Sequence, residues 1–214
     1  MSEVFQRIAA IGVVPVIAIE SAEHALPLAD ALLEGGLDVV EITFRTKVAA
    51  EVIATLSEKR PQLLTGAGTI LTAEQVAQAA TAGASFGLAP GHDPAIVSEA
   101  ASRGLPFAPG VMTPSEVSLA VARGCRLMKF FPAMAAGGPA MLKNVGAPFR
   151  HLGLRFIPTG GVSLQNLSDW LAMPEVAAVG GTWIARTEDM HDGNWSAITA
   201  RARAAVARAQ ELRG

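Results

Sequence analysis

Short apolar runs alternate with longer amphipathic stretches along the whole chain. The runs are rich in Val, Ile, Leu, Phe and Ala and have the length of buried β-strands, whereas the stretches between them carry apolar side chains at helical spacing. Strands are predicted to begin near Val13, Leu37, Leu63, Ser85, Pro106, Arg126, Leu154 and Val176. Helices are predicted at Ala22–Glu34, Val48–Arg60, Ala73–Ala82, Pro94–Arg103, Pro114–Arg123, Pro139–Val145, Leu164–Leu171 and Trp195–Leu212.

The spacing of the strands fits repeated strand–helix units. Successive strands start between 20 residues apart (Pro106 to Arg126) and 28 residues apart (Arg126 to Leu154), and a strand, a helix and two short loops need about 22. Residues that favour helix N-caps precede four of the helices, and glycines follow several others. The expected N-caps are Thr72, Asp93, Thr113 and Ser163, and the closing glycines are Gly35, Gly36, Gly83, Gly104 and Gly124.

Eight consecutive units indicate a (β/α)8 TIM barrel, formed as a single domain by residues 1–214. A short N-terminal helix, Glu3–Ala10, is expected to cover one end of this barrel. An open, doubly wound parallel sheet would also alternate in this way, and periodicity alone does not distinguish the two folds.

The composition limits the kinds of partner that the protein is expected to bind. Hydrophobic residues make up 50% of the chain, charged residues 17%, and the net charge is −2 with a pI near 6.1. Nucleic acids and anionic membranes favour basic surfaces, so neither is expected as a partner. No apolar run approaches the ~18 residues that span a bilayer. We therefore expect a cytoplasmic protein.

Residue usage also excludes several kinds of chemistry. The chain has one cysteine, Cys125, and no tyrosine, which excludes an internal disulfide, a multi-cysteine zinc site and any role for a tyrosine. The four histidines show no metal-binding spacing. The strongest metal candidate, the stretch from Glu188 to Asp192, is interpreted as a solvated surface loop.

A lysine interrupts the sixth predicted strand. Of the four lysines, only Lys129 lies inside an apolar run, Leu127–Pro132, whose residues supply no counter-ion. Burial disfavours the charged form of an amine, and a neutral amine can attack a carbonyl to form a Schiff base. The alternative is a lysine whose stem packs in the strand while its ammonium reaches solvent at the rim.

The second predicted strand ends in a carboxylate and a guanidinium. Side chains alternate along a strand, so Glu41 and Arg45 share the face of Val39, while Val40 and Ile42 share the opposite, apolar face. The apolar face suits the helix layer, which places Glu41 and Arg45 toward the barrel mouth. The alternative for Glu41 is a structural salt bridge with Arg45.

Glycine pairs follow the seventh and eighth strands, at Gly160-Gly161 and Gly180-Gly181. Their backbone N–H groups could approach an anion, and in barrels these loops often bind phosphate. Thr69 and Thr159 could each donate a hydroxyl to a carboxylate. Taken together, these groups fit a 2-oxo acid with a distal phosphate, cleaved through an imine while Glu41 moves the protons.

At these residues the chain resembles the class I aldolases of 2-keto-3-deoxy-6-phosphogluconate (KDPG) and 4-hydroxy-2-oxoglutarate (KHG). The resemblance covers nearly the whole chain, and the blocks that carry it keep the family's order. They include Glu41–Thr46 (EITFRT), Gly66–Thr69 (GAGT), Lys129–Ala133 (KFFPA), Pro158–Val162 (PTGGV) and Gly180–Trp183 (GGTW).

The resemblance implies a homotrimeric barrel that needs no metal or other cofactor. It would reversibly cleave KDPG to pyruvate and glyceraldehyde 3-phosphate, and also KHG to pyruvate and glyoxylate. Lys129 would form the imine and Glu41 would be the acid and base, with Phe131 packed over the site. The carboxylate would be held by Arg45, Thr69 and Thr159, and the phosphate by Gly160, Gly161, Ser163, Gly180, Gly181 and Thr182, where Thr182 replaces the family's serine.

Two other functions share part of this pattern. A phosphosugar epimerase or isomerase would use the same phosphate loops but form no imine. A catalytically silent barrel would bind phosphorylated metabolites as a sensor. Neither accounts for a lysine buried in an apolar strand.

Overall fold

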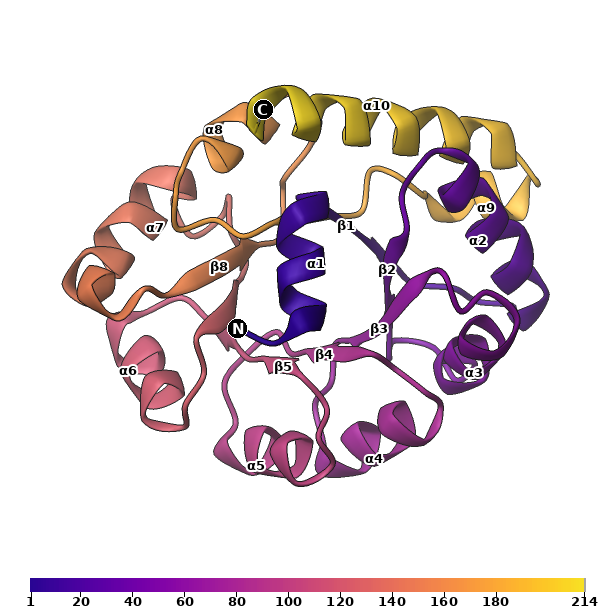
Figure 1. Ribbon diagram of the computed structural model, residues 1–214. Helices are drawn as coiled ribbons and strands as arrows, with labels where there is room; N and C mark the ends of the chain where they lie inside the picture. The colour runs from indigo at the N-terminus through magenta and orange to yellow at the C-terminus, as the bar shows by residue number, and fades with distance from the viewer. Residues whose placement is uncertain (214) are drawn as a thin grey trace.

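The predicted alternation of strands and helices closes into a barrel in the computed structural model, which describes residues 1–213 (Figure 1). Strands and helices follow one another around the ring in chain order. The strands are β1 (Val13–Ile17), β2 (Val39–Thr43), β3 (Leu64–Gly68), β4 (Phe86–Leu88), β5 (Phe107–Ala108), β6 (Gly110–Val111), β7 (Leu127–Phe130), β8 (Arg155–Pro158) and β9 (Val179–Gly181).

All of the strand pairs are parallel, and they form two arcs that join into one barrel. The arcs have the orders β5-β4-β3-β2-β1-β9 and β6-β7-β8. At one junction β5 and β6 are the two halves of the fifth predicted strand, separated by Pro109. At the other, bridges from Phe156 to Val176 and from Thr159 to Gly180 connect β8 to β9. This closure confirms the barrel and excludes the open sheet.

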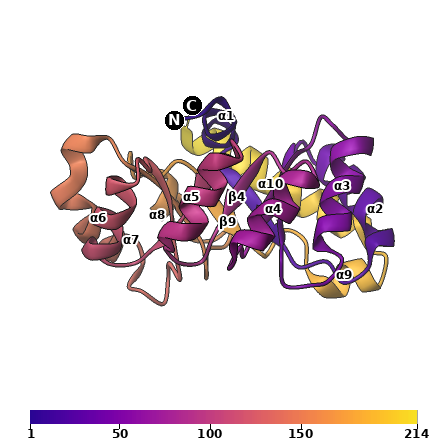
Figure 2. The ribbon, with the colours of Figure 1, turned by 90° about the horizontal axis from the view of Figure 1, so that it is seen from below.

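The helices surround the strands, except for α1, which crosses one end of the barrel (Figure 1). Figure 2 shows α1 and both chain ends on one side of the ring. Because α1 leads directly into β1, this closed end is the one where the strands begin. The helices are α1 (Glu3–Ile11), η1 (Ala22–His24), α2 (Ala25–Glu34), α3 (Ala49–Lys59), α4 (Ala73–Thr81), α5 (Pro94–Ser102), α6 (Pro114–Ala122), α7 (Gly138–Gly146), η2 (Ala147–Leu152), α8 (Leu167–Leu171), α9 (Thr187–His191) and α10 (Trp195–Arg213).

Local capping fixes where several helices begin. The side chains of Thr72, Asp93 and Thr113 accept backbone N–H groups at the starts of α4, α5 and α6, which confirms three of the predicted N-caps. The fourth is wrong, because α8 begins after Asn166, whose Oδ1 accepts the N–H of Ser163 at 2.9 Å. Ser163 therefore lies in the turn before the helix.

Two segments differ from the sequence-based expectation. The stretch from Glu188 to Asp192 is not a loop over most of its length, because Thr187–His191 forms α9. There Asp189 pairs with Arg201 of α10, and His191 lies 3.1 Å from Glu20. The eighth predicted strand is interrupted: Val176 pairs with Phe156 of β8 through a single parallel bridge, and the continuous strand β9 begins only at Val179.

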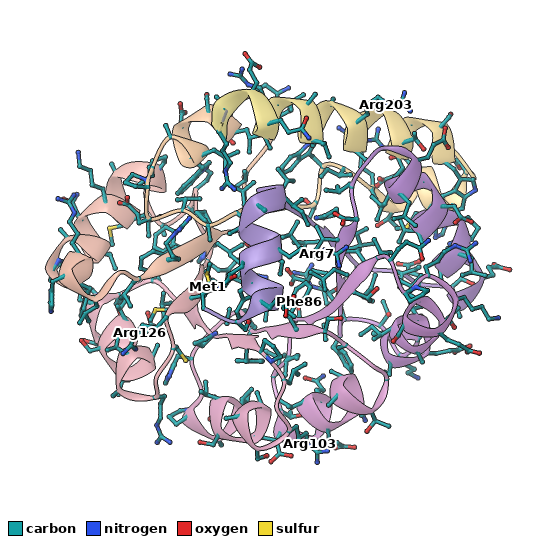
Figure 3. All side chains as sticks on the ribbon, viewed as in Figure 1. Met1, Arg7, Phe86, Arg103, Arg126 and Arg203 are labelled. Atoms are coloured by element: carbon teal, nitrogen blue, oxygen red, sulfur yellow. The ribbon has the colours of Figure 1, made fainter. Side chains whose placement is uncertain are left out.

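The core closes the floor of the barrel. Phe5 of α1 packs on Phe86 of β4 with ring centroids 6.4 Å apart, and Figure 3 labels Phe86 beside the lower end of α1. Arg213, at the end of α10, donates to the carbonyls of Ala9 and Ala177 and so ties α1 to the floor. Burial, and then the nearby Arg155 guanidinium, lower the pKa of Arg213 below its usual value. No helix within residues 1–213 is long and apolar enough to cross a membrane.

The start of α6 gives a test of the local electrostatics. The Glu116 carboxylate accepts the N–H groups of Met112 and Thr113, both at 2.8 Å, while Thr113 caps the helix. Burial alone would raise the pKa of Glu116, but the Met112 N–H and then the Thr113 hydroxyl and N–H hold this pKa below its usual value. The carboxylate thus stabilises the fold above its unfolded-state pKa, and that contribution is lost as the pH falls through the folded-state pKa.

Replacing Glu116 by alanine is therefore expected to lower the free energy of unfolding by about 1 kcal/mol at neutral pH. The difference from the native chain should shrink in acid, because the native carboxylate is then protonated. Urea denaturation at neutral and at acidic pH measures this difference in the free energy of unfolding. Ser115→Ala, at an exposed position of the same helix, is the control. A difference that grows in acid would contradict this assignment.

Candidate active site

Two charged side chains meet in the middle of the barrel. Lys129 of β7 and Glu41 of β2 both point inward, and Nζ donates to Oε1 at 3.0 Å. Their side chains are 5% and 1% exposed. Since β2 and β7 are not neighbours in the sheet, the pair spans the barrel interior. The inward placement of Glu41, inferred from strand alternation, is confirmed, and so is the burial of Lys129, expected from its place in an apolar strand.

The observed pair matches neither alternative drawn from the sequence for these residues, which were a Glu41–Arg45 salt bridge and a lysine that reaches solvent at the rim. The residues next to Lys129 in its strand supply no counter-ion, but the second strand does. Glu41 is paired with Lys129, and no Glu41–Arg45 ion pair occurs within the described residues. Lys129 does not reach solvent at the rim either, because its side chain is buried. A buried amine and carboxylate at hydrogen-bond distance can pass a proton directly between them.

A cavity of about 170 Å³ opens next to this pair, where the strands end. It brings together most of the predicted site residues, whereas two remain outside: Glu41 contacts Lys129 without lining the cavity, and Ser163 lies beyond it. The lining residues are Val16, Arg45, Thr69, Pro90, Lys129, Phe131, Thr159, Gly160, Gly161, Val162, Gly180, Gly181 and Thr182.

Larger hollows lie elsewhere on the protein but lack this chemistry. One of about 460 Å³ lies between α2 and α10, and one of about 470 Å³ lies between α3 and α4. Neither is lined by a lysine. Cys125 lies at the beginning of β7 rather than its end, and burial raises the pKa of its thiol despite the opposing charge of Arg126, so it is a poor nucleophile.

The walls of the cavity combine an aromatic ring, a hydroxyl and exposed backbone. The Phe131 ring centroid lies 5.8 Å from Lys129 Nζ. Thr159 is buried, and its hydroxyl donates to the Ile157 carbonyl at 3.4 Å. Gly160 and Gly161 have φ values of 101° and 75°, which glycine adopts without strain. A glycine backbone of this kind leaves N–H groups open to an anion.

Some lining residues were not predicted. Val16 of β1, Pro90 and Val162 contribute apolar surface to the cavity. Val16 lies near the end of its strand, where barrel sites form, so its position was a usable signal. Pro90 begins a Pro-Gly loop soon after the end of β4, and the sequence already indicated that this loop lies near the mouth. Val162 carries no chemical signal that separates it from other loop residues. No group of three or more His, Cys, Asp or Glu residues suited to a metal occurs in the part of the chain described.

A buried lysine beside a carboxylate, at the open end of a TIM barrel, is the arrangement that a class I lyase acting through an imine requires. The family model for KDPG and KHG aldolase matches residues 4–201, and the chain belongs to this family.

Named relatives agree with this assignment. The chain is 45% identical to 2-dehydro-3-deoxy-phosphogluconate aldolase of Pseudomonas aeruginosa over 94% of this chain and 90% of that one. It is 40% identical to the KHG/KDPG aldolase of Escherichia coli over 91% and 90%. Among solved structures, KDPG aldolase of Legionella pneumophila, with pyruvate captured as a covalent carbinolamine, matches with a TM-score of 0.90, 40% identity and coverage of 95% and 98%.

The backbone at Thr69 yields a test of strain in the site. Its φ of 54° lies in the left-handed region, the only such value outside glycine within residues 1–213, and a β-branched residue is strained there. Asparagine tolerates this region, so Thr69→Asn is expected to raise the free energy of unfolding by about 1 kcal/mol. Urea denaturation measures the change. Thr72→Asn, which keeps an N-cap acceptor on α4, should change it little. A loss of stability in Thr69→Asn would contradict the strain.

Proposed function

We propose that this enzyme reversibly cleaves KDPG to pyruvate and glyceraldehyde 3-phosphate through an imine on Lys129. The observation that carries the proposal is the buried Lys129–Glu41 pair, 3.0 Å apart, beside a cavity at the barrel mouth. KHG, which lacks the phosphate, is proposed as a second substrate, cleaved to pyruvate and glyoxylate. Both substrates share the 2-oxo acid that the amine attacks.

The reaction divides the work between the two side chains. Lys129 first passes a proton to Glu41, and the neutral amine so formed adds to the C2 carbonyl. Glu41 then gives this proton to the carbinolamine hydroxyl, which leaves as water and yields an iminium ion. Glu41 takes the proton of the C4 hydroxyl as the C3–C4 bond breaks, and the bonding electrons flow into the iminium to give an enamine. The aldehyde leaves, Glu41 returns the proton to C3, and water hydrolyses the imine to release pyruvate.

The substrate carboxylate would lie among Arg45, Thr69 and Thr159, which line the cavity around Lys129. A guanidinium can bind a carboxylate through two parallel hydrogen bonds, and each threonine adds a hydroxyl. Phe131 would cover the reacting carbons and exclude water. These groups fix the 2-oxo acid so that C2 faces Nζ.

The phosphate would bind at the glycine-rich ends of β8 and β9. Gly160 and Gly161 expose backbone there, the buried Gly180 and Gly181 line the cavity from the end of β9, and Thr182 is an exposed residue that adds a hydroxyl. Ser163 is omitted from this proposal because its N–H is held by Asn166 and it does not line the cavity.

We also propose that the enzyme is a cytoplasmic homotrimer. Leu71, Met112 and Met134 are exposed large apolar side chains, and each follows a strand at the open end of the barrel. Exposed apolar side chains at this end of the barrel support association with another subunit. The free, half-buried thiol of Cys125 is consistent with a reducing compartment.

Incubation with pyruvate and borohydride is expected to add a stable mass at Lys129, because the reductant converts the imine to an amine. Lys129→Ala should remove this adduct and lower kcat by about 10⁴-fold or more while the fold remains. Peptide mass spectrometry and circular dichroism give the two measurements.

The other lysines provide matched controls. Lys47, Lys59 and Lys143 lie outside the strands, and their alanine variants should keep both the adduct and the activity. Absence of an adduct in the native enzyme, or an adduct on one of these three residues, would defeat the proposal. Absence of the adduct is also what an epimerase or a silent sensor would give.

Variants of Thr182 test the binding of the phosphate separately from the binding of the rest of the substrate. Thr182→Val keeps the shape but removes the hydroxyl, so KM for the phosphorylated substrate should rise about tenfold, while KM for KHG stays unchanged. Thr182→Ser should be nearly neutral, since serine keeps the hydroxyl and the residue is exposed. Ser163→Ala, which does not touch the cavity, is the control in both assays. An equal rise in KM for KHG would place Thr182 at the carboxylate instead.

A further inference from the structure

The last residue of β3, Gly68, lies against the carboxylate of Glu41. A Cβ added at Gly68 would lie 2.6 Å from both Cγ and Cδ of Glu41, and closer still to Oε1. Real Cβ atoms do not approach other heavy atoms within 3.0 Å. Any side chain at this position would therefore displace the Glu41 side chain.

Gly68 is not required by backbone conformation. It lies in regular strand, and its φ is not among the positive values of the chain. Alanine could adopt the same backbone without strain. The requirement at this position is thus the empty volume itself, and that volume is filled by Glu41.

The atom closest to this volume is the one that accepts the hydrogen bond from Lys129. Glu41 Oε1 receives the Nζ–H at 3.0 Å and is the nearest atom to the missing Cβ. Strands β2 and β3 are neighbours, with Glu41 paired to Gly66 and Thr43 to Gly68 (Figure 1). The Glu41 side chain leans along its strand toward the mouth, which brings it over Gly68.

We propose that Gly68 is a positioning residue, whose missing side chain lets Glu41 adopt the one conformation that reaches the catalytic amine. This inference rests on the proposed function, in which Glu41 moves the protons. Gly68 acts only through Glu41 and does not contact the substrate.

The neighbouring Gly66 shows what a purely structural glycine does in the same strand. It lies two residues earlier, on the same face, and a Cβ there would overlap the ring of Phe86 rather than Glu41. Phe86 belongs to the floor of the barrel, where it packs on Phe5. Gly66→Ala is therefore a matched control that disturbs packing while leaving the Lys129–Glu41 pair in place.

The test begins with Gly68→Ala. Loss of positioned proton transfer should lower kcat by about 100-fold or more and alter the pH profile of kcat. The adduct with pyruvate and borohydride should persist, because Lys129 is retained. Gly66→Ala should lower thermal stability but keep kcat of the folded enzyme within about threefold. Native kcat and pH profile in Gly68→Ala would overturn the inference.

A double-mutant cycle with Glu41→Ala separates positioning from general damage. That substitution removes Cγ, Cδ and Oε1, the atoms that a Cβ at Gly68 would meet, so adding Gly68→Ala should cause no further loss of kcat. Multiplying losses would overturn the inference. If Gly68→Ala alone does not fold, the double variant should be the more stable of the two, and equal instability would count against the proposal. Failure of pyruvate to label the native enzyme would defeat the proposed function instead.

Discussion

The ion pair between Lys129 and Glu41 constrains the rest of the barrel. Two charges taken out of water are tolerated only when they face each other at close range, and removing one partner of such a pair costs about 3–5 kcal/mol. Glu41 and Lys129 come from the second and sixth strands of the eightfold barrel, once β5 and β6 are counted as one. Alternate strands contribute side chains to the same layer of a barrel, so only the closed sheet places both groups at one level.

The surrounding residues follow from this pair. Val40 and Ile42 alternate with Glu41 along β2 and are fully buried on the other face, so the strand is apolar toward the helices and charged toward the axis. Gly68 of β3 provides the volume that the carboxylate needs inside. At the mouth the apolar surface ends, and hydroxyls and glycine backbone line the cavity. The alternation of side chains along β2 therefore places apolar residues against the helices and the catalytic carboxylate inside the barrel.

Much of this arrangement could be predicted from local sequence signals. Strand runs, N-caps such as Asp93 and Thr113, and the inward faces of Glu41 and Lys129 depend on neighbours in the chain, so the pattern indicated them. The partner of Lys129 could not be found in this way, because Glu41 lies 88 residues away. α8 begins after Asn166 and not after Ser163, because residues 164–166 form a turn before the helix. α9 is a short helix stabilised by contacts such as Asp189 with Arg201, which its own sequence does not show.

The reaction requires one end of the barrel to be closed to water and the other to admit the substrate. An imine must form in a site that admits a 2-oxo acid, and the amine must otherwise remain shielded from water. At the floor, α1 places Phe5 against Phe86, and Arg213 ties α1 to the end of the sheet, so the amine has no opening on that side. At the mouth, Thr69, the two glycines that follow β8 and the two glycines of β9 line the cavity above the pair. The closed floor thus directs access to the Lys129 amine toward the mouth, where this residue lines the cavity.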